Sequence, residues 1–261
     1  MAPILTSNPS VTLNPEPLTP ENFAPFGTAI SSPLPRDLNV APQPSSLPSH
    51  NPAPVLTNQN SALKYSPISP LLDRYTNACP SGKASEARMT MFCCFPRQLR
   101  TVTPGQQPNK EVFDVRILER HPFTNQTFIP IDLSSHSKVG DREDEPIYLV
   151  VVAPTRKGET ATAKNEAGET VTIHDPPDLH NVKAFIAHGG QAVTYGVGTW
   201  HAPMVVLGRR RVDFVVVQFV NGVGDEDCQE AAFDEGIVVD LGHNGQHGRK
   251  EKGPKLWTAK L

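Results

Sequence analysis

Eight short runs of β-branched and aromatic residues begin at Met89 and restrict the chain to folds built from sheets. Each run spans four to nine residues, and Gly, Pro, Asn or Asp residues lie between the runs, as is typical of strands joined by turns. No amphipathic helix separates them, so neighbouring strands are expected to pair antiparallel in a sandwich or barrel. The runs are MTMFCCF (89–95), VFDVRILE (112–119), QTFIPI (126–131), IYLVVVA (147–153), VKAFIA (182–187), AVTY (192–195), PMVVL (203–207) and VDFVVVQFV (212–220). The sequence thus predicts a mainly β fold with a few short helices.

Proline limits what the first part of the chain can form. The chain has 27 prolines, concentrated early. The stretch Ser31–Pro54 can sustain neither a helix nor the hydrogen-bonded pairing of β-strands, because proline fixes φ and lacks a backbone N–H donor. We expect this stretch to be a surface excursion in extended or polyproline conformation. A cap residue, a proline and an acid in the first turn predict a short helix over Thr19–Phe26, which ends at Gly27.

Two polar stretches interrupt the strand-rich part of the chain, Ser134–Pro146 and Arg156–Asp178. The second is expected to be a polar insertion that carries a hairpin outside the core. Residues 248–261 are polar and rich in Gly and Lys, so we expect a flexible tail. The strand runs follow one another without a clear break, so a single domain over residues 1–261 is predicted.

The charge of the chain gives no reason to expect a nucleic-acid or membrane partner. The formal net charge is −3, and the two short basic runs, Arg209–Arg211 and Arg249–Lys255, fit solvated loops. The longest apolar runs are too short to span a bilayer, and the N-terminus lacks the basic start and apolar stretch of a secretory signal. A small-molecule enzyme is the expected class.

The cysteines are expected to be reduced thiols of an intracellular protein. Cys93 and Cys94 are adjacent, and neighbours on a strand point to opposite faces, so these two are not expected to pair. Cys79 and Cys228 lie far from them in the sequence, and the chain has no CxxC spacing. No metal site built from sulfur is therefore predicted.

Two polar clusters within strand-like segments are the candidates for chemistry. The motifs of nucleophilic and nucleotide-dependent enzymes are absent, since the chain has no GxSxG, no P-loop and no GxGxxG after a strand. In the first cluster Glu119 and His121 share one face by the strand period of two, and Gln126 returns beside them across a tight turn. In the second, a turn at Gly198 delivers His201 into the start of a strand.

The spacings of these clusters resemble the two cupin motifs, usually H-x-H-x3–4-E and G-x-x-H. Those four positions normally bind a metal through imidazoles and a carboxylate. Here Glu119 stands in place of the first histidine and Gln126 in place of the acid. His121, Gln126 and His201 are therefore candidate ligands of one divalent ion. The plainer alternative is that His121 is a core histidine and that Glu119 pairs with a neighbouring arginine. The match of both clusters to the two motifs together favours a functional pocket.

Longer segments resemble the ureidoglycolate lyase family. They run in order across most of the chain, and the LERHP and GTWHxP motifs within them are distinctive. The form TYGxGTWHAPM, followed by NGVxDEDCQE, resembles the fungal members, and TNQNSALKY (57–65) is a fainter match. The matching segments are TPENFAPFG (19–27), ILERHPFTNQTFIPI (117–131), YLVVVAP (148–154), PDLHNVKAFIAHGGQAVTYGVGTWHAPMVVL (177–207) and VDFVVVQFVNGVGDEDCQE (212–230).

The resemblance implies a cupin-like jelly-roll barrel, usually a homodimer, that is a carbon–nitrogen lyase of the amidine-lyase type. Its reaction cleaves (S)-ureidoglycolate to glyoxylate and urea in purine and allantoin degradation, with no nucleotide or organic cofactor. The shared positions imply a catalytic set of Glu119, His121, Gln126 and His201. The positions implied in substrate binding are Arg120, Tyr195 and Trp200.

The chain departs from the family pattern at three positions. Bacterial members often carry histidines where this chain has Gly196 and Ala202, so neither of those imidazoles is expected to be essential. Many members also carry arginine in the place of Cys93, which leaves open what binds the substrate carboxylate. Lys64 is the substitute that the sequence offers, although a solvated lysine is the plainer interpretation.

The implied substrate is a carbinolamide, in which one carbon bears a hydroxyl, a carboxylate and a ureido nitrogen. Its cleavage needs a base for the hydroxyl proton and an acid for the departing nitrogen, and neither a nucleophile nor a redox cofactor. His201 or Glu119 is the expected base, and His121 with Gln126 is expected to bind the oxygens. A divalent ion that polarises the hydroxyl and the carboxylate is the alternative.

Three other functions stay open. An amidohydrolase would act on the same substrate and release ammonia, but that chemistry normally needs a two-metal site with several histidines and acids, which the sequence lacks. Another cupin metalloenzyme would bind iron through two histidines and a carboxylate. A non-catalytic small-molecule binder would reuse the barrel without turnover.

The last three residues, Ala259-Lys260-Leu261, resemble the Ser-Lys-Leu peroxisomal address, with small, basic and leucine side chains in the same order. The polar tail before them is expected to leave this triplet available to the import receptor. We therefore expect a peroxisomal location, with the cytoplasm as the alternative.

Overall fold

The structure is a computed structural model that describes residues 2–7, 9–35, 37–76, 78–103, 109–131 and 147–243. The polar stretch at 134–146 and the tail at 248–261, with its C-terminal triplet, lie outside the described residues. Within the described part the chain is mainly β, as predicted, with helices α1 (Pro20–Phe23) and α2 (Gly224–Asp227) and the 3-10 turn η1 (Pro44–Ser46). Neither of these α-helices has the length or the apolar stretch needed to cross a membrane.

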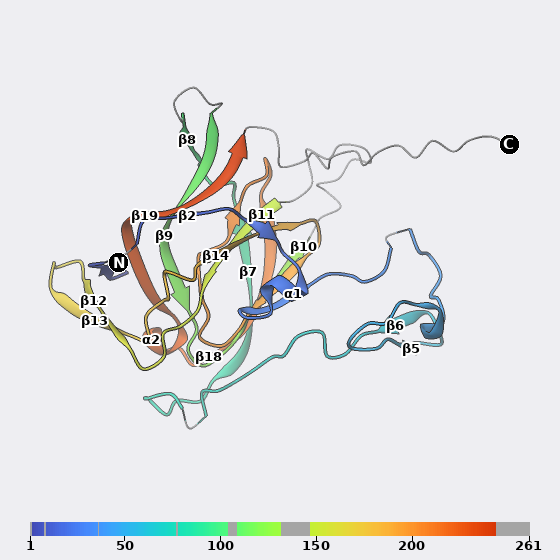
Figure 1. Cartoon of the computed structure of the whole chain (residues 1–261). Coiled ribbons are helices and arrows are strands. Elements are labelled where there is room, and N and C mark those ends of the chain that lie inside the picture. The colour runs from blue at the N-terminus through green and yellow to red at the C-terminus, as the bar shows by residue number, and fades with distance from the viewer. Residues whose placement is uncertain are drawn as a thin grey trace.

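The described strands form two sheets and one separate hairpin (Figure 1). The larger sheet has the order β13 (Thr170–His174), β12 (Thr160–Lys164), β1 (Ile4–Leu5), β19 (Gln229–His243), β9 (Lys110–Arg120), β16 (Trp200–His201), β11 (Ile147–Ala153), β14 (Lys183–His188) and β3 (Glu16–Pro17). Three further strands, β2 (Val11–Leu13), β8 (Arg100–Val102) and β17 (Val205–Val206), pair with β19, β9 and β11. The smaller sheet has the order β4 (Gly27–Ile30), β15 (Ala192–Tyr195), β10 (Gln126–Ile131), β18 (Val212–Val220) and β7 (Glu86–Cys94). The hairpin consists of β5 (Val55–Thr57) and β6 (Ala62–Lys64).

Strand β11 is a central strand of the fold: the side chains on both of its faces are buried. Val150 and Val152 pack into a cluster that also takes side chains from the smaller sheet, including Phe128 and Phe214. Alternate residues such as Val151 contribute to a second cluster on the opposite face, which β9, β19 and the β12–β13 hairpin complete. The fold is therefore two sheets packed face to face, with the larger sheet curved around a second core of its own.

All eight predicted strands are present, with ends shifted by a few residues. The sequence reading missed β19 and the short N-terminal strands, of which β1 and β2 pair parallel to β19 and β3 pairs parallel to β14. Strand β19 was not predicted because polar residues before Gly236 interrupt its apolar pattern. The register shifts there, between Ala232 and Ile237, as in a β-bulge.

The predicted helix at 19–26 begins as expected and is shorter. The hydroxyl oxygen of Thr19 accepts a hydrogen bond from the N–H of Asn22 at 3.2 Å, and α1 ends four residues after this cap. Gly27, which follows, has a φ of +150°, and a Cβ there would lie 1.9 Å from the carbonyl oxygen of Thr194. Because Gly27 is paired with Tyr195, this glycine lets β4 approach the strand that carries a site residue.

The structure agrees with the prediction for the proline-rich excursion and only partly with the prediction for the polar insertion. Between residues 31 and 54 the described part contains no strand, which agrees with the predicted excursion, and the β5–β6 hairpin that follows stands away from both sheets in Figure 1. A hairpin forms in the polar insertion from β12 and β13, as predicted. Its predicted place outside the core is wrong, because Ala163 and Ile173 are buried in the core of the larger sheet and β12 pairs with β1.

Candidate active site

The ends of four strands bring the predicted catalytic residues together. Glu119 lies near the end of β9 and His201 at the end of β16, and these two residues are directly paired in the larger sheet. Gln126 is the first residue of β10 and is paired with Tyr195, the last residue of β15, in the smaller sheet. The candidate site therefore lies where the two sheets face each other.

Buried polar side chains hold the turn between His121 and Gln126. The side-chain oxygen of Asn125 accepts a hydrogen bond from the N–H of Leu72 at 2.8 Å, and the hydroxyl of Thr124 donates to the carbonyl of Leu72 at 3.2 Å. Leaving such a buried group unsatisfied costs about 1–3 kcal/mol. These bonds therefore fix the direction in which His121 and Gln126 enter the site.

The imidazole of His201 is the centre of the cluster. Its Nε2 lies 3.3 Å from Oε1 of Glu119 and 3.2 Å from Oε1 of Gln126. Tyr195 stacks on the ring, with centroids 3.9 Å apart and planes 12° from parallel, and the centroid of the His121 ring is 5.5 Å away. The side chain of Glu119 is 21% exposed, whereas the other four residues are at most 5% exposed. Glu119 is therefore the member of the cluster that a ligand from solvent reaches first.

Both histidines use Nδ1 for a hydrogen bond to the backbone. Nδ1 of His121 lies 2.6 Å from the carbonyl oxygen of Asp227, and Nδ1 of His201 lies 3.0 Å from that of Thr199. A carbonyl oxygen can only accept, so each Nδ1 carries a proton. Each Nε2 is consequently turned toward the shared space of the site and offers a lone pair when its ring is neutral.

The cluster fits a divalent metal ion. The ligand atoms of Glu119, His121 and His201 all lie within 4.8 Å of one another. Nε2 of His121 is buried with no hydrogen-bond partner among the described residues, and Nε2 of His201 faces two oxygens. A cation between these atoms would satisfy all of them, and imidazoles whose other nitrogen donates to a carbonyl are typical metal ligands. Glu119 thus joins the predicted candidates His121 and His201, and Gln126 lies beside this group.

Burial and neighbouring charges set the protonation of the cluster. Burial, and after it the charge of His201, lowers the pKa of His121 below its ordinary value. Burial alone would raise the pKa of Glu119, but the hydrogen bond with His201 and the positive charge that either imidazole carries when protonated bring it below its ordinary value. His121 is therefore neutral and Glu119 ionised at neutral pH, which are the forms that ligate a metal.

Three of the residues predicted to bind substrate lie elsewhere. Trp200 is buried in the core on the far face of the larger sheet, with the guanidinium of Arg120 5.0 Å above its ring. Arg120 also donates to Oε1 of Gln229 at 2.8 Å, so its donors are used within the fold. Lys64 lies on β6 in the separate hairpin. Of the four predicted substrate-binding residues, the structure brings Tyr195 alone to the cluster.

Two neighbours of the cluster were missed by sequence reasoning, Gln218 and Cys228. Oε1 of Gln218 accepts a hydrogen bond from Nε2 of Gln126 at 2.5 Å. The Cys228 thiol lies 4.0 Å from Oε2 of Glu119, and burial raises its pKa to about 12, so it stays protonated. A polar residue inside the apolar run VDFVVVQFV is a signal that could have found Gln218, whereas the sequence around Cys228 holds no such signal.

The chain is similar to ureidoglycolate lyases over most of its length. The sequence model of the family described as ureidoglycolate lyase matches residues 10–240. A ureidoglycolate lyase of Schizosaccharomyces pombe is 31% identical over 222 residues, which cover 85% of this chain and 92% of that protein. One of Saccharomyces cerevisiae is 32% identical over 235 residues, which cover 87% and 97%. One of Burkholderia mallei is 35% identical over 111 residues, which cover 42% and 46%. The chain belongs to the ureidoglycolate lyase family.

Proposed function

We propose that this protein is a ureidoglycolate lyase that cleaves (S)-ureidoglycolate to glyoxylate and urea. The observation that carries the proposal is the meeting of Glu119, His121, Gln126 and His201 at one site in a chain of this family. The relatives with that name match this chain over most of its length and most of theirs. The test is whether the purified protein forms glyoxylate and urea in equal amounts from this substrate.

Glu119 is placed to move the one proton that the reaction requires. Cleavage takes the proton from the substrate hydroxyl, turns the C–O bond into a carbonyl, breaks the C–N bond and returns the proton to the departing nitrogen. The hydroxyl oxygen and the nitrogen are bound to the same carbon, so one carboxylate can accept the proton from the first and deliver it to the second. Oε1 of Glu119 faces His201, whereas Oε2 lies beside the Cys228 thiol and is assigned to the proton.

In this proposal the two imidazoles and Gln126 border the place of the substrate oxygens, where a neutral ring accepts a hydrogen bond at Nε2 and a protonated ring donates one. Nε2 of His121 and Nε2 of His201 face the same space, and the bond to Gln218 fixes the amide of Gln126 beside them. Glu119, His121 and His201 would hold a divalent ion, which when bound supplies polarisation of the hydroxyl and carboxylate oxygens.

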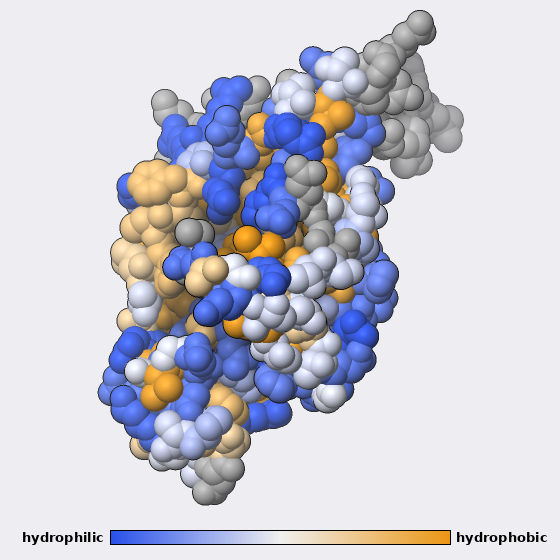
Figure 2. Space-filling view, turned by 90° about the vertical axis from the view of Figure 1, so that its left-hand side faces the viewer, coloured by the Kyte–Doolittle hydropathy of each residue, from blue (hydrophilic) through white to orange (hydrophobic). Residues whose placement is uncertain are grey.

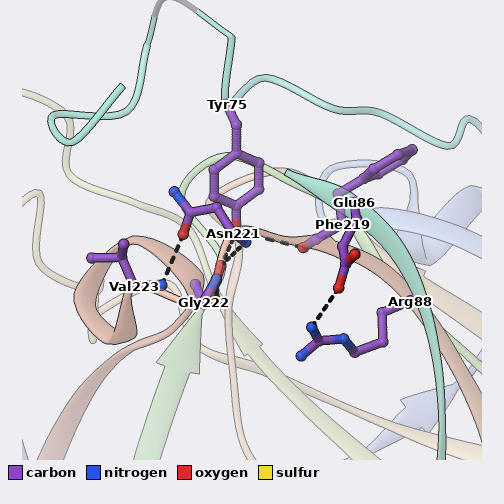
Figure 3. Close-up of polar contacts among 8 residues, drawn as sticks. Tyr75, Glu86, Arg88, Phe219, Asn221, Gly222 and Val223 are labelled. Carbon is purple, nitrogen blue, oxygen red and sulfur yellow. Dashed lines mark hydrogen bonds and ion pairs between the residues drawn. The ribbon is translucent and has the colours of Figure 1, made fainter. Parts of the chain in front are cut away.

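We assign the substrate carboxylate to Arg88 in place of Lys64. Arg88 is paired with Gln218 between β7 and β18, so both side chains lie on one face of the smaller sheet, and Gln218 bonds to Gln126. The Arg88 side chain is 50% exposed and pairs with Glu86 at 2.8 Å (Figure 3). Exposed ion pairs of this kind contribute little stability, so a ligand can displace Glu86. A guanidinium group matches a carboxylate with two hydrogen bonds.

We further propose that the two sheets form the cupin-like jelly roll that the family resemblance implies. The support is the place of the two motifs. The corner at Glu119–Gln126 and the corner at Gly198–His201 meet at one site between the sheets, as the motif pair requires.

A second copy of the chain is the partner that we propose for strand β7. This strand is at the edge of the smaller sheet, and Met89, Met91, Phe92 and Phe95 are between 45% and 72% exposed. Figure 2 shows a pale-orange area of apolar residues along the left side of the molecule. An exposed apolar edge strand invites pairing unless it is covered, and a homodimer covers it. Light scattering of the purified protein is expected to give the mass of two chains, and the mass of one chain would contradict the proposal.

We propose import into the peroxisome through the C-terminal triplet Ala259-Lys260-Leu261. The support is its small, basic and leucine order, which resembles the receptor-read address. The test is a fluorescent protein fused at the N-terminus, imaged with Leu261 present and with Leu261 deleted. Punctate peroxisomal signal that disappears on deletion is expected, and diffuse signal from both forms would contradict it.

A further inference from the structure

The backbone carbonyl of Asp227 selects the tautomer of His121. It accepts a hydrogen bond from Nδ1–H, with nitrogen and oxygen 2.6 Å apart, and so leaves Nε2 of the neutral ring unprotonated and facing the site. The carboxylate of the same residue accepts three further hydrogen bonds, each of 2.7 Å, from the hydroxyl of Tyr75 and the N–H groups of Asn221 and Gly222. Asp227 is thus held at its side chain while its carbonyl holds the imidazole.

Tyr75 supplies the side-chain donor among these three bonds. The residue is 1% exposed, and its ring packs against Phe123 with centroids 5.4 Å apart, two residues beyond His121. Burial, and after it the hydrogen bond to Asp227, raises the pKa of Tyr75, so the hydroxyl stays protonated and donates. Figure 3 shows the Tyr75 ring directed into the turn at 221–223.

A second carboxylate fastens the same turn to the same segment of chain. Glu226 is buried and accepts hydrogen bonds from the N–H and the hydroxyl of Ser81, at 2.6 and 2.7 Å, and from Nδ2 of Asn221 at 2.6 Å. Glu226 therefore holds the turn as a whole. The hydroxyl of Tyr75 makes its shortest contact, 2.7 Å, with Asp227, the residue whose carbonyl meets the imidazole of His121, and longer contacts of 3.4 Å with the carbonyls of Phe219 and Glu226.

We propose that Tyr75 and Asp227 are positioning residues that keep the proton of His121 on Nδ1. Neither residue touches the reacting atoms. Without the Tyr75 bond the Asp227 carboxylate keeps only its two backbone N–H donors, so its carbonyl is held less firmly against Nδ1 and the ring can also take the tautomer with its proton on Nε2. That tautomer neither binds a cation nor accepts a hydrogen bond from a substrate at Nε2. The expected loss of lyase turnover rests on the proposed function, whereas the expected change in the His121 tautomer does not.

The test is Tyr75→Phe, with Tyr148→Phe as the matched control. Tyr148 is equally buried, and its hydroxyl donates to the backbone carbonyl of Gln191 at 2.5 Å instead of to the Asp227 carboxylate. In metal-free protein labelled with ¹⁵N at histidine, the chemical shifts of the two ring nitrogens report the tautomer of His121. The Nδ1–H form is expected in the wild type and in Tyr148→Phe. In Tyr75→Phe it is expected to give way to a mixture with the Nε2–H form.

The kinetic arm measures kcat and KM of the same proteins. Tyr75→Phe is expected to lower kcat about tenfold, the scale for a residue that orients a site histidine, with KM changed by less than about twofold. Asp227→Asn is expected to move both readouts in the same direction, and Tyr75→Phe decides alone where that variant does not fold. An unchanged His121 tautomer or an unchanged kcat in Tyr75→Phe overturns the proposal. A wild type without lyase activity, combined with the expected tautomer change, supports the positioning and overturns the lyase assignment instead.

Discussion

Glu119 and His201 are directly opposite each other on β9 and β16, and Oε1 of the glutamate lies 3.3 Å from Nε2 of the histidine. The glutamate keeps some exposure, whereas the histidine is buried under Tyr195. The hydrogen bond with His201, and the charge that either imidazole carries when protonated, keep the pKa of Glu119 low, so it stays ionised. One member of the pair can therefore exchange protons with a substrate, while the other binds an oxygen or a cation.

His121→Ala and His201→Ala are each expected to lower turnover by about two to four orders of magnitude, because each removes an Nε2 that faces the site. Both variants should stay folded, as judged by circular dichroism. His180→Ala and His188→Ala are the matched controls, since both residues are exposed and lie outside the cluster. A folded His121→Ala or His201→Ala protein with near-normal turnover would remove that residue from the site.

Glu119→Gln is expected to abolish most turnover, by about two to four orders of magnitude, because an amide of the same shape cannot accept the hydroxyl proton. Binding of the substrate should be affected much less, so the loss should appear in kcat. Glu169→Gln, in the exposed turn of the β12–β13 hairpin, is the control for removing one carboxylate. If Glu119→Gln kept its kcat, the proton would have to be moved by another group.

Removal of metal by a chelator is expected to reduce activity, and addition of a divalent ion is expected to restore it. The reason is that Glu119, His121 and His201 converge on one space with a buried, unpartnered nitrogen. Metal analysis should find one ion per chain in the wild type and none bound tightly in His201→Ala. Full activity in protein shown to be metal-free would contradict the metal assignment and leave the imidazoles as direct hydrogen-bond partners.

Arg88→Leu is expected to raise KM by about 10- to 100-fold with little change in kcat, since a hydrogen bond to a charged group contributes about 1.5–3 kcal/mol. Arg156→Leu is the matched control, because Arg156 also forms an exposed ion pair with a nearby glutamate, Glu159. Steady-state kinetics on both variants checks the assignment. An unchanged KM in Arg88→Leu would leave the substrate carboxylate without its proposed partner.

The predicted residues at the strand ends lie together in the structure, whereas Arg120 and Trp200, which directly neighbour two of them, lie on the opposite face of the larger sheet. Glu119 and His201 could be predicted, because polar residues at the ends of apolar strands are costly unless they are used. Arg120 and Trp200 could have been excluded by the same strand period of two, which points direct neighbours of site residues to the opposite face. Family resemblance favoured them, and the pleat of the sheet places them in the second core.

Other contacts could not be predicted from a single sequence. The bond between Nδ1 of His121 and Asp227 uses a backbone carbonyl, which every residue possesses, so no side-chain pattern marks it. The place of Arg88 depends on the register of β7 against β18, which the sequence of neither strand determines by itself. Strand β19 could not be recognised from its sequence pattern, because the polar bulge before Ile237 interrupts it.

The decisive measurement of the lyase reaction is of the products that purified wild-type protein forms from (S)-ureidoglycolate. Glyoxylate and urea are expected in equal amounts, with no ammonia when urease is absent, because Glu119 moves a proton and no water is added. His201→Ala, prepared in the same way, is the control for contaminating activity and should form neither product at a comparable rate. Ammonia in place of urea would contradict the lyase reaction and assign the site to hydrolysis.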